Sequence, residues 1–330
     1  MGRTPAALKG CEPLCYALPS QVGTGTPPGS GRAAGIGRGR ARNGVEDRLV
    51  QIRTDSSRGP AFRLSPLEVF VVGWRHRSLI DRLTRREIAA KYRGAILGPL
   101  WSLLTPLMML AVYTFLFSVV FQSRWGTGSS GHGEFALLFF SGMIIFTIFS
   151  EPVMRAPTLM LENVSYIKKV VFPLEILPWT CLGVALFNGA VSFLVLAVFY
   201  LLVFGLPPVT ALLLPLVLLP LGLATLGVTW FLASVGVFLR DVRQLVGAVT
   251  TALMFLSPIF YPVTAVPDSY RWLLYLNPLT ITLEASKDVL FWGRVPDPGS
   301  WAGDLLAGWL IAWAGYVWFM KTRKAFADVV

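Results

Sequence analysis

Residues 176–239 read ILPWTCLGVALFNGAVSFLVLAVFYLLVFGLPPVTALLLPLVLLPLGLATLGVTWFLASVGVFL and contain no charged residue. A helix needs about 20 apolar residues to cross a bilayer, so this stretch is long enough for two such helices. The segment 205–208, Gly-Leu-Pro-Pro, divides the stretch and predicts a tight turn. The sequence therefore predicts two consecutive membrane-spanning helices.

Four further uncharged runs flank this pair, at 94–123, 135–150, 244–267 and 305–320. The two shorter runs reach spanning length when Glu151 or Asp304 is included at one end. Together the runs predict an all-α integral membrane protein with six transmembrane helices. We expect these spans at 97–121, 135–154, 179–204, 210–238, 244–262 and 301–320.

The composition also indicates a membrane protein, because only 14% of the 330 residues are charged, against about 25% in soluble domains. Residues 1–93 hold 17 Lys and Arg but only 7 Asp and Glu. We interpret residues 1–62, rich in Gly, Pro and Arg, as a disordered tail. Residues 63–93 are predicted to form an amphipathic interfacial helix that leads into the transmembrane domain, 94–330. Membrane lipids, and not nucleic acid, are the expected partner of this basic segment.

The distribution of Lys and Arg sets the orientation of the spans. With the N-terminus in the cytoplasm, the predicted inner segments hold 25 of these residues and the outer segments hold 4. The first 60 residues contain no apolar run of the signal-peptide type. Both termini are therefore expected in the cytoplasm.

Ionisable residues are missing from the middle of every predicted span. Ion-coupled carriers need such groups at depth, so the pattern argues against a carrier driven by protons or sodium. The sequence has no GxxxxGK[ST] phosphate loop, and its three cysteines form no metal-ligand pattern. If transport is active, its energy must come from another polypeptide.

Three motifs point to a family. Residues 85–101 read RREIAAKYRGAILGPLW, and residues 166–178 read YIKKVVFPLEILP. The third motif combines Arg-Asp-Val at 240–242 with SPIFYP at 257–262 and NPL at 277–279. In this order among six spans, the motifs resemble the permease subunit of ABC-2 type polysaccharide exporters, over about residues 65–330. Lipopolysaccharide O-antigen exporters are the most similar, and teichoic-acid and capsule exporters are related.

The resemblance implies a homodimer that pairs with two ATP-binding subunits in the bacterial inner membrane. A lipid-linked glycan, most simply O-antigen, would cross between the two permeases. ATP and magnesium would bind the partner subunit, so no cofactor and no catalytic activity are expected in this chain. Teichoic acid and capsular polysaccharide are alternative cargoes.

The resemblance further implies that segment 163–172 is the coupling helix that docks into the ATP-binding subunit. Lysines would lie on one side of this element and apolar residues on the other. Its expected docking residues are Asn163, Tyr166, Lys168, Lys169 and Phe172. The alternative is that the two lysines only anchor the loop on the positive inner side.

The basic motif is expected either to recognise the pyrophosphate of the lipid carrier or to contact the ATP-binding subunit. The residues concerned are Arg85, Arg86, Lys91, Tyr92 and Arg93. Simple attraction to anionic lipid is an equally open interpretation.

Two prolines near the outer end of the fifth span predict a helix break, because proline removes a backbone donor. In the family this region forms an outer gate, although Pro-rich outer loops also occur without gating. The expected gate residues are Ser257, Pro258, Tyr261, Pro262, Asn277 and Pro278. Two aromatic residues nearer the middle of the first span, Tyr113 and Phe117, are expected to line the channel.

A membrane glycosyltransferase or ligase is the alternative from a different functional class. Such an enzyme would need an essential acidic residue on an outer loop. The candidates are Glu134, Asp268, Glu284 and Asp288.

Overall fold

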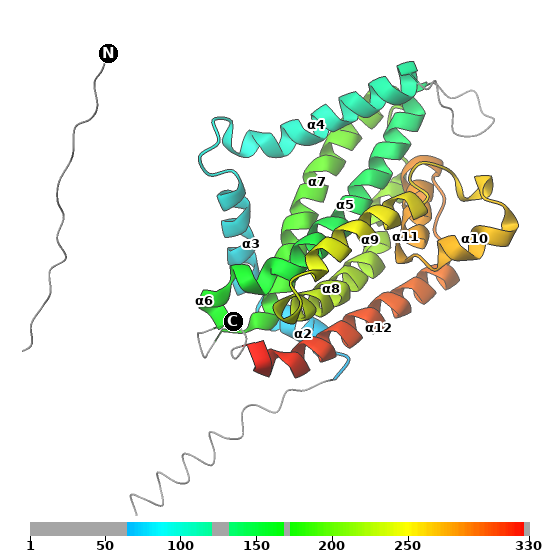
Figure 1. Ribbon diagram of the computed structural model, residues 1–330. Helices are drawn as coiled ribbons and strands as arrows, with labels where there is room; N and C mark the ends of the chain where they lie inside the picture. The colour runs from blue at the N-terminus through cyan, green and yellow to red at the C-terminus, as the bar shows by residue number, and fades with distance from the viewer. Residues whose placement is uncertain (1–64, 121–131, 168–171, 327–330) are drawn as a thin grey trace, which may run out of the picture. The chain divides into compact units, whose positions relative to one another are not determined.

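The computed structural model describes residues 65–120, 132–167 and 172–326. Within these ranges every regular element is a helix (Figure 1). The α-helices are α2 (Glu68–Arg75), α3 (Arg77–Lys91), α4 (Trp101–Thr114), α5 (His132–Glu162), α6 (Val164–Ile167), α7 (Leu177–Val203), α8 (Leu214–Phe238), α9 (Val242–Leu256), α10 (Asp268–Tyr275), α11 (Pro278–Lys287) and α12 (Pro298–Thr322). The predicted all-α fold class is confirmed. The predicted tail, 1–62, lies outside the described residues.

Four helical segments of the described chain are long and apolar enough to cross a membrane. They are Gly98–Phe117, Phe135–Glu162, Leu174–Val203 and Val209–Phe238. These segments coincide with the first four predicted spans. The total of six spans is consistent with the structure and stays a prediction.

Helices also occupy the positions of the fifth and sixth predicted spans. Helix α9 is apolar but has only 15 residues, and it ends at Leu256 instead of residue 262. Pro258 explains the early end, because proline lacks an amide donor and disfavours helix in the residue before it. Helix α12 has 25 residues, but Asp304 and several tryptophans lower its mean hydropathy.

Helix α5 is longer than its predicted span, 135–154. It runs from His132 to Glu162 and contains Pro152 and Pro157. Packing against α7 and α8 keeps the helix continuous across these prolines. Glu151 and Arg155 consequently lie inside an apolar helix, which corrects the expectation that charged residues are confined to the ends of the spans.

The predicted interfacial helix, 63–93, is two helices, because the chain breaks at His76 between α2 and α3. Helix α3 packs beside α7 (Figure 1), which is one of the candidate spans. The two helices approach closely at Gly183, where a Cβ atom would lie 2.8 Å from Thr84 Oγ1. The amphipathic pattern of α3 did not predict this packing along a span.

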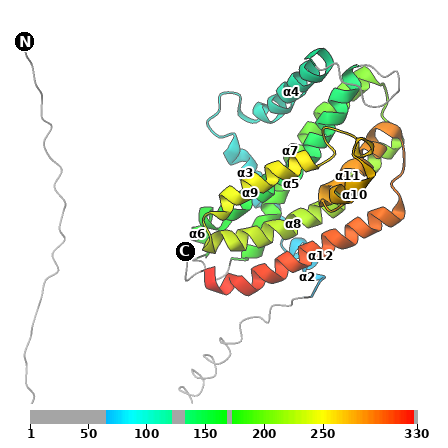
Figure 2. The same cartoon turned by 45° about the vertical axis from the view of Figure 1, so that its right-hand side comes forward.

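Helix α8 packs against α5, α7, α11 and α12 (Figure 2). Its contacts with α5 and α12 bring backbone against backbone. A Cβ atom on Gly227 would overlap the backbone of Ile311 in α12, and one on Gly236 would overlap the Pro157 carbonyl in α5. Small residues permit such close packing between membrane helices, where the hydrophobic effect gives little attraction.

We expect Gly227→Ala to destabilise the protein by about 1–3 kcal/mol, because the added methyl group overpacks the contact between α8 and α12. Gly222→Ala on the same helix is the matched control, since no atom lies within 4 Å of its Cβ position. That control should be neutral or stabilise by about 0.5–1 kcal/mol through helix propensity. Thermal unfolding in detergent measures both effects, and equal melting temperatures for the two variants would contradict the prediction.

Candidate functional site

The predicted ATPase-coupling residues lie where α5 ends. Asn163 Nδ2 donates a hydrogen bond to the Leu159 carbonyl at 2.9 Å, and the Asn163 carbonyl accepts one from the Tyr166 amide. Asn163 therefore closes α5 and starts α6. The described helical part of the expected coupling helix is short, only the four residues of α6. Lys168 and Lys169 lie outside the described residues.

Tyr166 and Phe172 stack face to face, with ring centroids 4.3 Å apart and an interplanar angle of 10°. The Arg86 guanidinium lies 5.8 Å from the centre of the Tyr166 ring, within the range of a cation–π contact. The fold thus joins a residue of the basic motif to the predicted coupling residues.

Glu175 and Arg323 anchor the other end of this loop. Arg323 Nη1 lies 2.7 Å from Glu175 Oε2, and Arg323 Nη2 lies 3.4 Å from the Phe172 carbonyl. Both side chains are largely buried, so water competes weakly for the ion pair. Sequence reasoning missed this pair, because nothing links two residues 148 positions apart.

The predicted basic cluster is distributed over several neighbours. Arg85 pairs with Asp81 at 2.9 Å on an exposed face of α3, and Arg86 points to Tyr166. Lys91 pairs with Glu151 of α5 at 3.2 Å. Two of the expected phosphate-binding cations therefore already have carboxylate partners within the chain.

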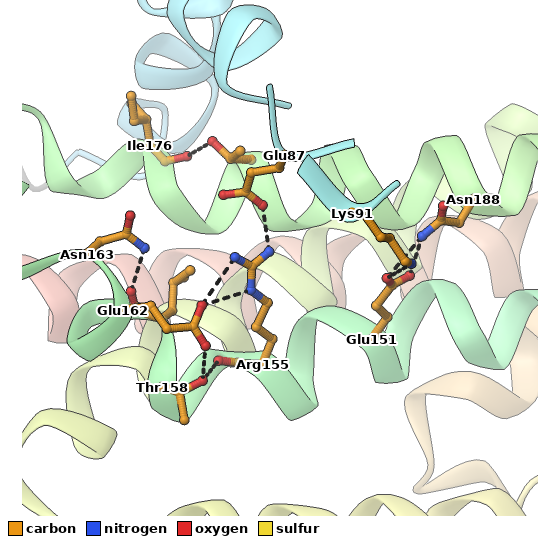
Figure 3. A network of polar contacts seen from close by, with 11 residues as sticks. Glu87, Lys91, Glu151, Arg155, Thr158, Glu162, Asn163, Ile176 and Asn188 are labelled. Carbon is orange, nitrogen blue, oxygen red and sulfur yellow. Dashed lines mark hydrogen bonds and ion pairs between the residues drawn. The ribbon is translucent and has the colours of Figure 1, made fainter. Parts of the chain in front are cut away.

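Ion pairs connect α3 with α5, and hydrogen bonds add α7 to this network (Figure 3). Arg155 Nη1 lies 2.5 Å from Glu87 Oε2, and Arg155 Nη2 lies 3.2 Å from Glu162 Oε2. The Asn188 amide of α7 donates to both oxygens of Glu151, at 3.0 and 2.9 Å. Sequence reasoning did not assign a role to any of these residues.

A cavity of about 480 Å³ lies between α4, α5 and α7. Lys91 and Tyr92, predicted as interface residues, line it together with Tyr113, predicted as a channel residue. The other polar lining residues are Ser102, Thr105, Thr147, Ser150, Glu151, Asn188 and Ser192. Hydroxyl and amide groups can both donate and accept hydrogen bonds, and tyrosine rings supply flat apolar faces.

A second cavity, of about 610 Å³, shares Tyr92 and Ser102 with the first and is lined by Arg85. The two cavities follow the side of α3 that faces α4 and α7. Phe117 and the predicted gate residues are not among the residues that line them. The structure therefore brings Arg85, Lys91, Tyr92 and Tyr113 to one connected surface.

The predicted gate residues form a buried polar cluster. Asn277 Nδ2 donates to Ser257 Oγ at 2.8 Å, and Asn277 Oδ1 accepts from the Leu279 amide at the start of α11. Pro278 is the first residue of α11. Lys287, at the other end of α11, donates to the Pro258 carbonyl at 2.5 Å and is only 3% exposed. Sequence reasoning joined the two motifs but missed Lys287.

The other gate residues lie beside this cluster. The Tyr261 hydroxyl donates to the Phe255 carbonyl at 3.1 Å. Pro262 precedes a short 3₁₀ turn, Val263–Ala265. The segment after α9 is thus held back against the end of that helix.

One buried aromatic ring connects the predicted channel and gate. Phe139 of α5 lies 4.7 Å from the rings of both Tyr113 and Phe117, and 5.1 Å from the ring of Phe260. The expected channel residues of α4 therefore pack against the gate segment through α5. Phe139 lies within a long apolar run, and nothing in the sequence distinguishes it from its neighbours.

Residues 79–291 match the family of ABC-2 type transporters. This chain belongs to that family. The matched range begins in α3 and includes the loop after α5, both cavities and the gate cluster. The ABC-2 membrane domain accordingly contains all of the predicted site residues together with the ion pairs of Figure 3.

Two relatives align along almost their whole length. The O-antigen export system permease protein RfbA of Myxococcus xanthus is 27% identical over 259 residues, which cover 78% of this chain and 97% of that protein. A protein of the same name from Klebsiella pneumoniae is 22% identical over 254 residues, covering 76% of this chain and 95% of the relative. The unmatched part of this chain is accordingly larger than that of either relative.

We expect the stability of the ABC-2 domain to rise between about pH 8 and pH 10. Burial lowers the pKa of Lys287 to about 8, while the unfolded chain keeps the usual value near 10.5. Below pH 8 both states are protonated, and the full cost of burying the ammonium is present. Above pH 8, Lys287 loses its proton in the folded protein but keeps it in the unfolded chain. The free energy of unfolding therefore rises by an amount on the order of 2 kcal/mol.

Thermal unfolding of wild type and Lys287→Met at several pH values in this range measures the effect. The variant should lose the rise that Lys287 causes, because methionine does not titrate. Equal pH dependence in the two proteins would contradict the assignment.

Proposed function

We propose that this chain is the permease subunit of an ATP-driven exporter of lipid-linked polysaccharide. The cargo we infer is O-antigen, moved from the cytoplasmic to the outer face of the bacterial inner membrane. The observation that carries this proposal is family membership together with end-to-end similarity to two O-antigen export permeases. The alternative cargoes are teichoic acid and capsular polysaccharide.

The energy comes from a separate ATP-binding subunit, which also holds the magnesium ion, and the permease works as a homodimer. The loop after α5 is the docking element. The stack of Tyr166 on Phe172, with Arg86 over the Tyr166 ring, supports this role because it gives the loop a defined shape. A pre-shaped element binds a partner with less loss of conformational entropy.

The cavity between α4, α5 and α7 receives the head of the lipid-linked glycan. Its hydroxyl groups and the rings of Tyr92 and Tyr113 suit hydrogen bonding and stacking with sugars. Lys91 lines this cavity and Arg85 lines the adjoining one, and each has N–H donors beyond those used in its carboxylate pair to offer the pyrophosphate. Contacts of Arg86 and Arg93 with the ATP-binding subunit are the other role open to the basic motif.

The outer gate consists of the cluster around Ser257 and Asn277, together with the segment through Pro262. Buried hydrogen bonds hold this cluster closed. Phe139 connects it to the aromatic residues of α4. Both termini lie in the cytoplasm in this arrangement.

The acidic residues of the outer segments support transport over the glycosyltransferase alternative. Asp268 is paired with Arg271 at 2.5 Å, and Asp288 lies 4.0 Å from Arg294. Glu284 accepts a long hydrogen bond from the Tyr275 hydroxyl. Each of these three acids thus has a polar partner in the structure, which supports a structural role for them over a catalytic one.

We expect Lys168→Glu/Lys169→Glu to lose the complex with the ATP-binding subunit and to trap the lipid-linked glycan on the cytoplasmic face. Both substitutions replace a positive by a negative side chain, so they reverse the charge that the docking loop presents to its partner. Lys321→Glu/Lys324→Glu is the matched control, because it makes the same change near the end of α12. Co-purification and the location of the glycan are the measurements. Glycan that reaches the outer face but stays unattached to its acceptor would instead favour the ligase.

We expect Thr147→Trp to reduce export by about tenfold or more, because an indole at this position fills the cavity. Thr147 lines the cavity and is exposed, so the chain should still fold. Val198→Trp, at an exposed position of α7 outside the cavity, is the control. Glycan export by the two variants is compared at equal expression. Equal export would rule out the cavity as the glycan site.

A further inference from the structure

Two matched pairs of charged residues face each other across α3 and α5 (Figure 3). On α3, Glu87 lies four residues before Lys91, and on α5, Glu151 lies four residues before Arg155. Arg155 binds Glu87 and Lys91 binds Glu151, so the two helices run antiparallel here and every charge meets its opposite. We call these four residues the ion-pair ladder.

The ladder fixes the register of the two helices. Residues four apart on an α-helix lie on one face, about one turn from each other. If α3 moved by one turn along α5, either Glu87 would face Glu151 or Lys91 would face Arg155. Like charges at such a contact repel, and the original partners would be left unpaired. The charge pattern therefore favours one register and disfavours both of its neighbours.

The surroundings of the ladder strengthen this constraint. The Glu87 side chain is only 16% exposed, and Arg155 is 35% exposed. Leu83 of α3 and Leu159 of α5 flank this pair in the same buried cluster. Few water molecules can replace a lost partner at such a site. At the other pair, the Asn188 amide holds both oxygens of Glu151 in place.

Arg155 also connects the ladder to the coupling loop. Its guanidinium binds Glu162, the last residue of α5, which Thr158 holds by a hydrogen bond of 2.8 Å. Asn163 begins the coupling segment directly afterwards. A displacement of this segment therefore reaches Arg155 through its ion pair with Glu162, and then reaches α3 through the ion pair of Arg155 with Glu87.

The opposite end of the ladder reaches the cavity. Lys91 and Glu151 both line it, and Tyr92 follows Lys91 at the end of α3. Any movement of α3 and α5 together relative to α4 and α7 consequently changes the cavity wall. The two ion pairs, joined by one turn of α3 and one turn of α5, thus connect the end of α5 with the cavity.

We propose that Glu87 and Arg155 are positioning residues that transmit the movement of the coupling segment to α3 and thereby reshape the cavity. The inference rests on the proposed function in requiring an ATP-binding partner. It does not depend on which glycan is carried. The ladder keeps α3 and α5 moving as one unit during the cycle.

The test uses the complex of the full chain with its ATP-binding partner in lipid bilayers. Cys11 and Cys15 are first replaced by Ser, and Cys181 can stay because it is buried. Thr147→Cys then places a single accessible thiol in the cavity wall, and its labelling by a maleimide is measured with and without ATP. The variants are Glu87→Arg, Arg155→Glu and the double exchange. The double exchange also carries Glu162→Arg, so that one carboxylate at position 155 faces two guanidinium groups, the reverse of the wild-type arrangement. Arg82→Glu is the control, since it reverses a charge at an exposed position of α3 that belongs neither to the ladder nor to the lining of either cavity.

Each single reversal should reduce the ATP-dependent change in labelling by about tenfold, with ATP hydrolysis and partner binding near wild type. The double exchange should restore the change to within about threefold, and Arg82→Glu should leave it intact. A double exchange as impaired as the single variants, or single variants with the wild-type change, would overturn the proposal.

A second variant covers the case in which the reversed chains fail to accumulate. Arg155→Lys keeps the charge but lacks the planar fork that spans two carboxylates. It should uncouple labelling from ATP while the protein folds normally, and wild-type coupling in this variant would also overturn the proposal. Glycan export is followed in parallel. An intact labelling response without export would contradict the proposed cargo and leave the ladder supported.

Discussion

The contact between Gly236 of α8 and the backbone of Pro157 in α5 positions the part of the fold on which the candidate site depends. Without a side chain at residue 236, the two helices approach until backbone meets backbone, and this fixes α5 against α8. Arg155 lies two residues before Pro157, so the same contact sets the place from which its guanidinium reaches α3 and the end of α5. The ion pairs, the coupling loop and the cavity wall all depend on that placement.

Charged residues inside an apolar helix are costly unless they are paired. Glu151 and Arg155 meet this condition through Lys91 and Glu87, which come from a helix that precedes the first span. Helix α3 is therefore more than a basic segment at the membrane surface. It supplies the opposite charges that allow α5 to continue as a helix to Glu162, and it closes one side of both cavities.

The sequence was sufficient for the fold class and the first four long apolar helices, because uncharged runs of spanning length have few other structures open to them. The break after α9 was also predictable, since Pro258 acts locally. The ladder was not predictable. Its four residues form two ordinary i, i+4 pairs. Only the fold, in which α3 packs on α7 and its side chains reach α5, shows that residues 60 or more apart form ion pairs. The same holds for Arg323 with Glu175, and for Lys287 with the Pro258 carbonyl.

Helix α5 connects the two ends of the proposed transport path. Near the start of α5, the Phe139 ring contacts Phe260 of the predicted gate segment. Near its end, Arg155 forms an ion pair with Glu162, the residue just before the predicted coupling loop. The sixteen residue steps from Phe139 to Arg155 span about 24 Å of helix, but Pro152 interrupts the backbone hydrogen bonds within that length. Glu151 and Arg155 lie on either side of this proline, and both are bound to α3. Helix α3 therefore supports α5 at the point where its own backbone is weakest, and under the proposed function this support limits bending at Pro152 when the coupling loop is displaced.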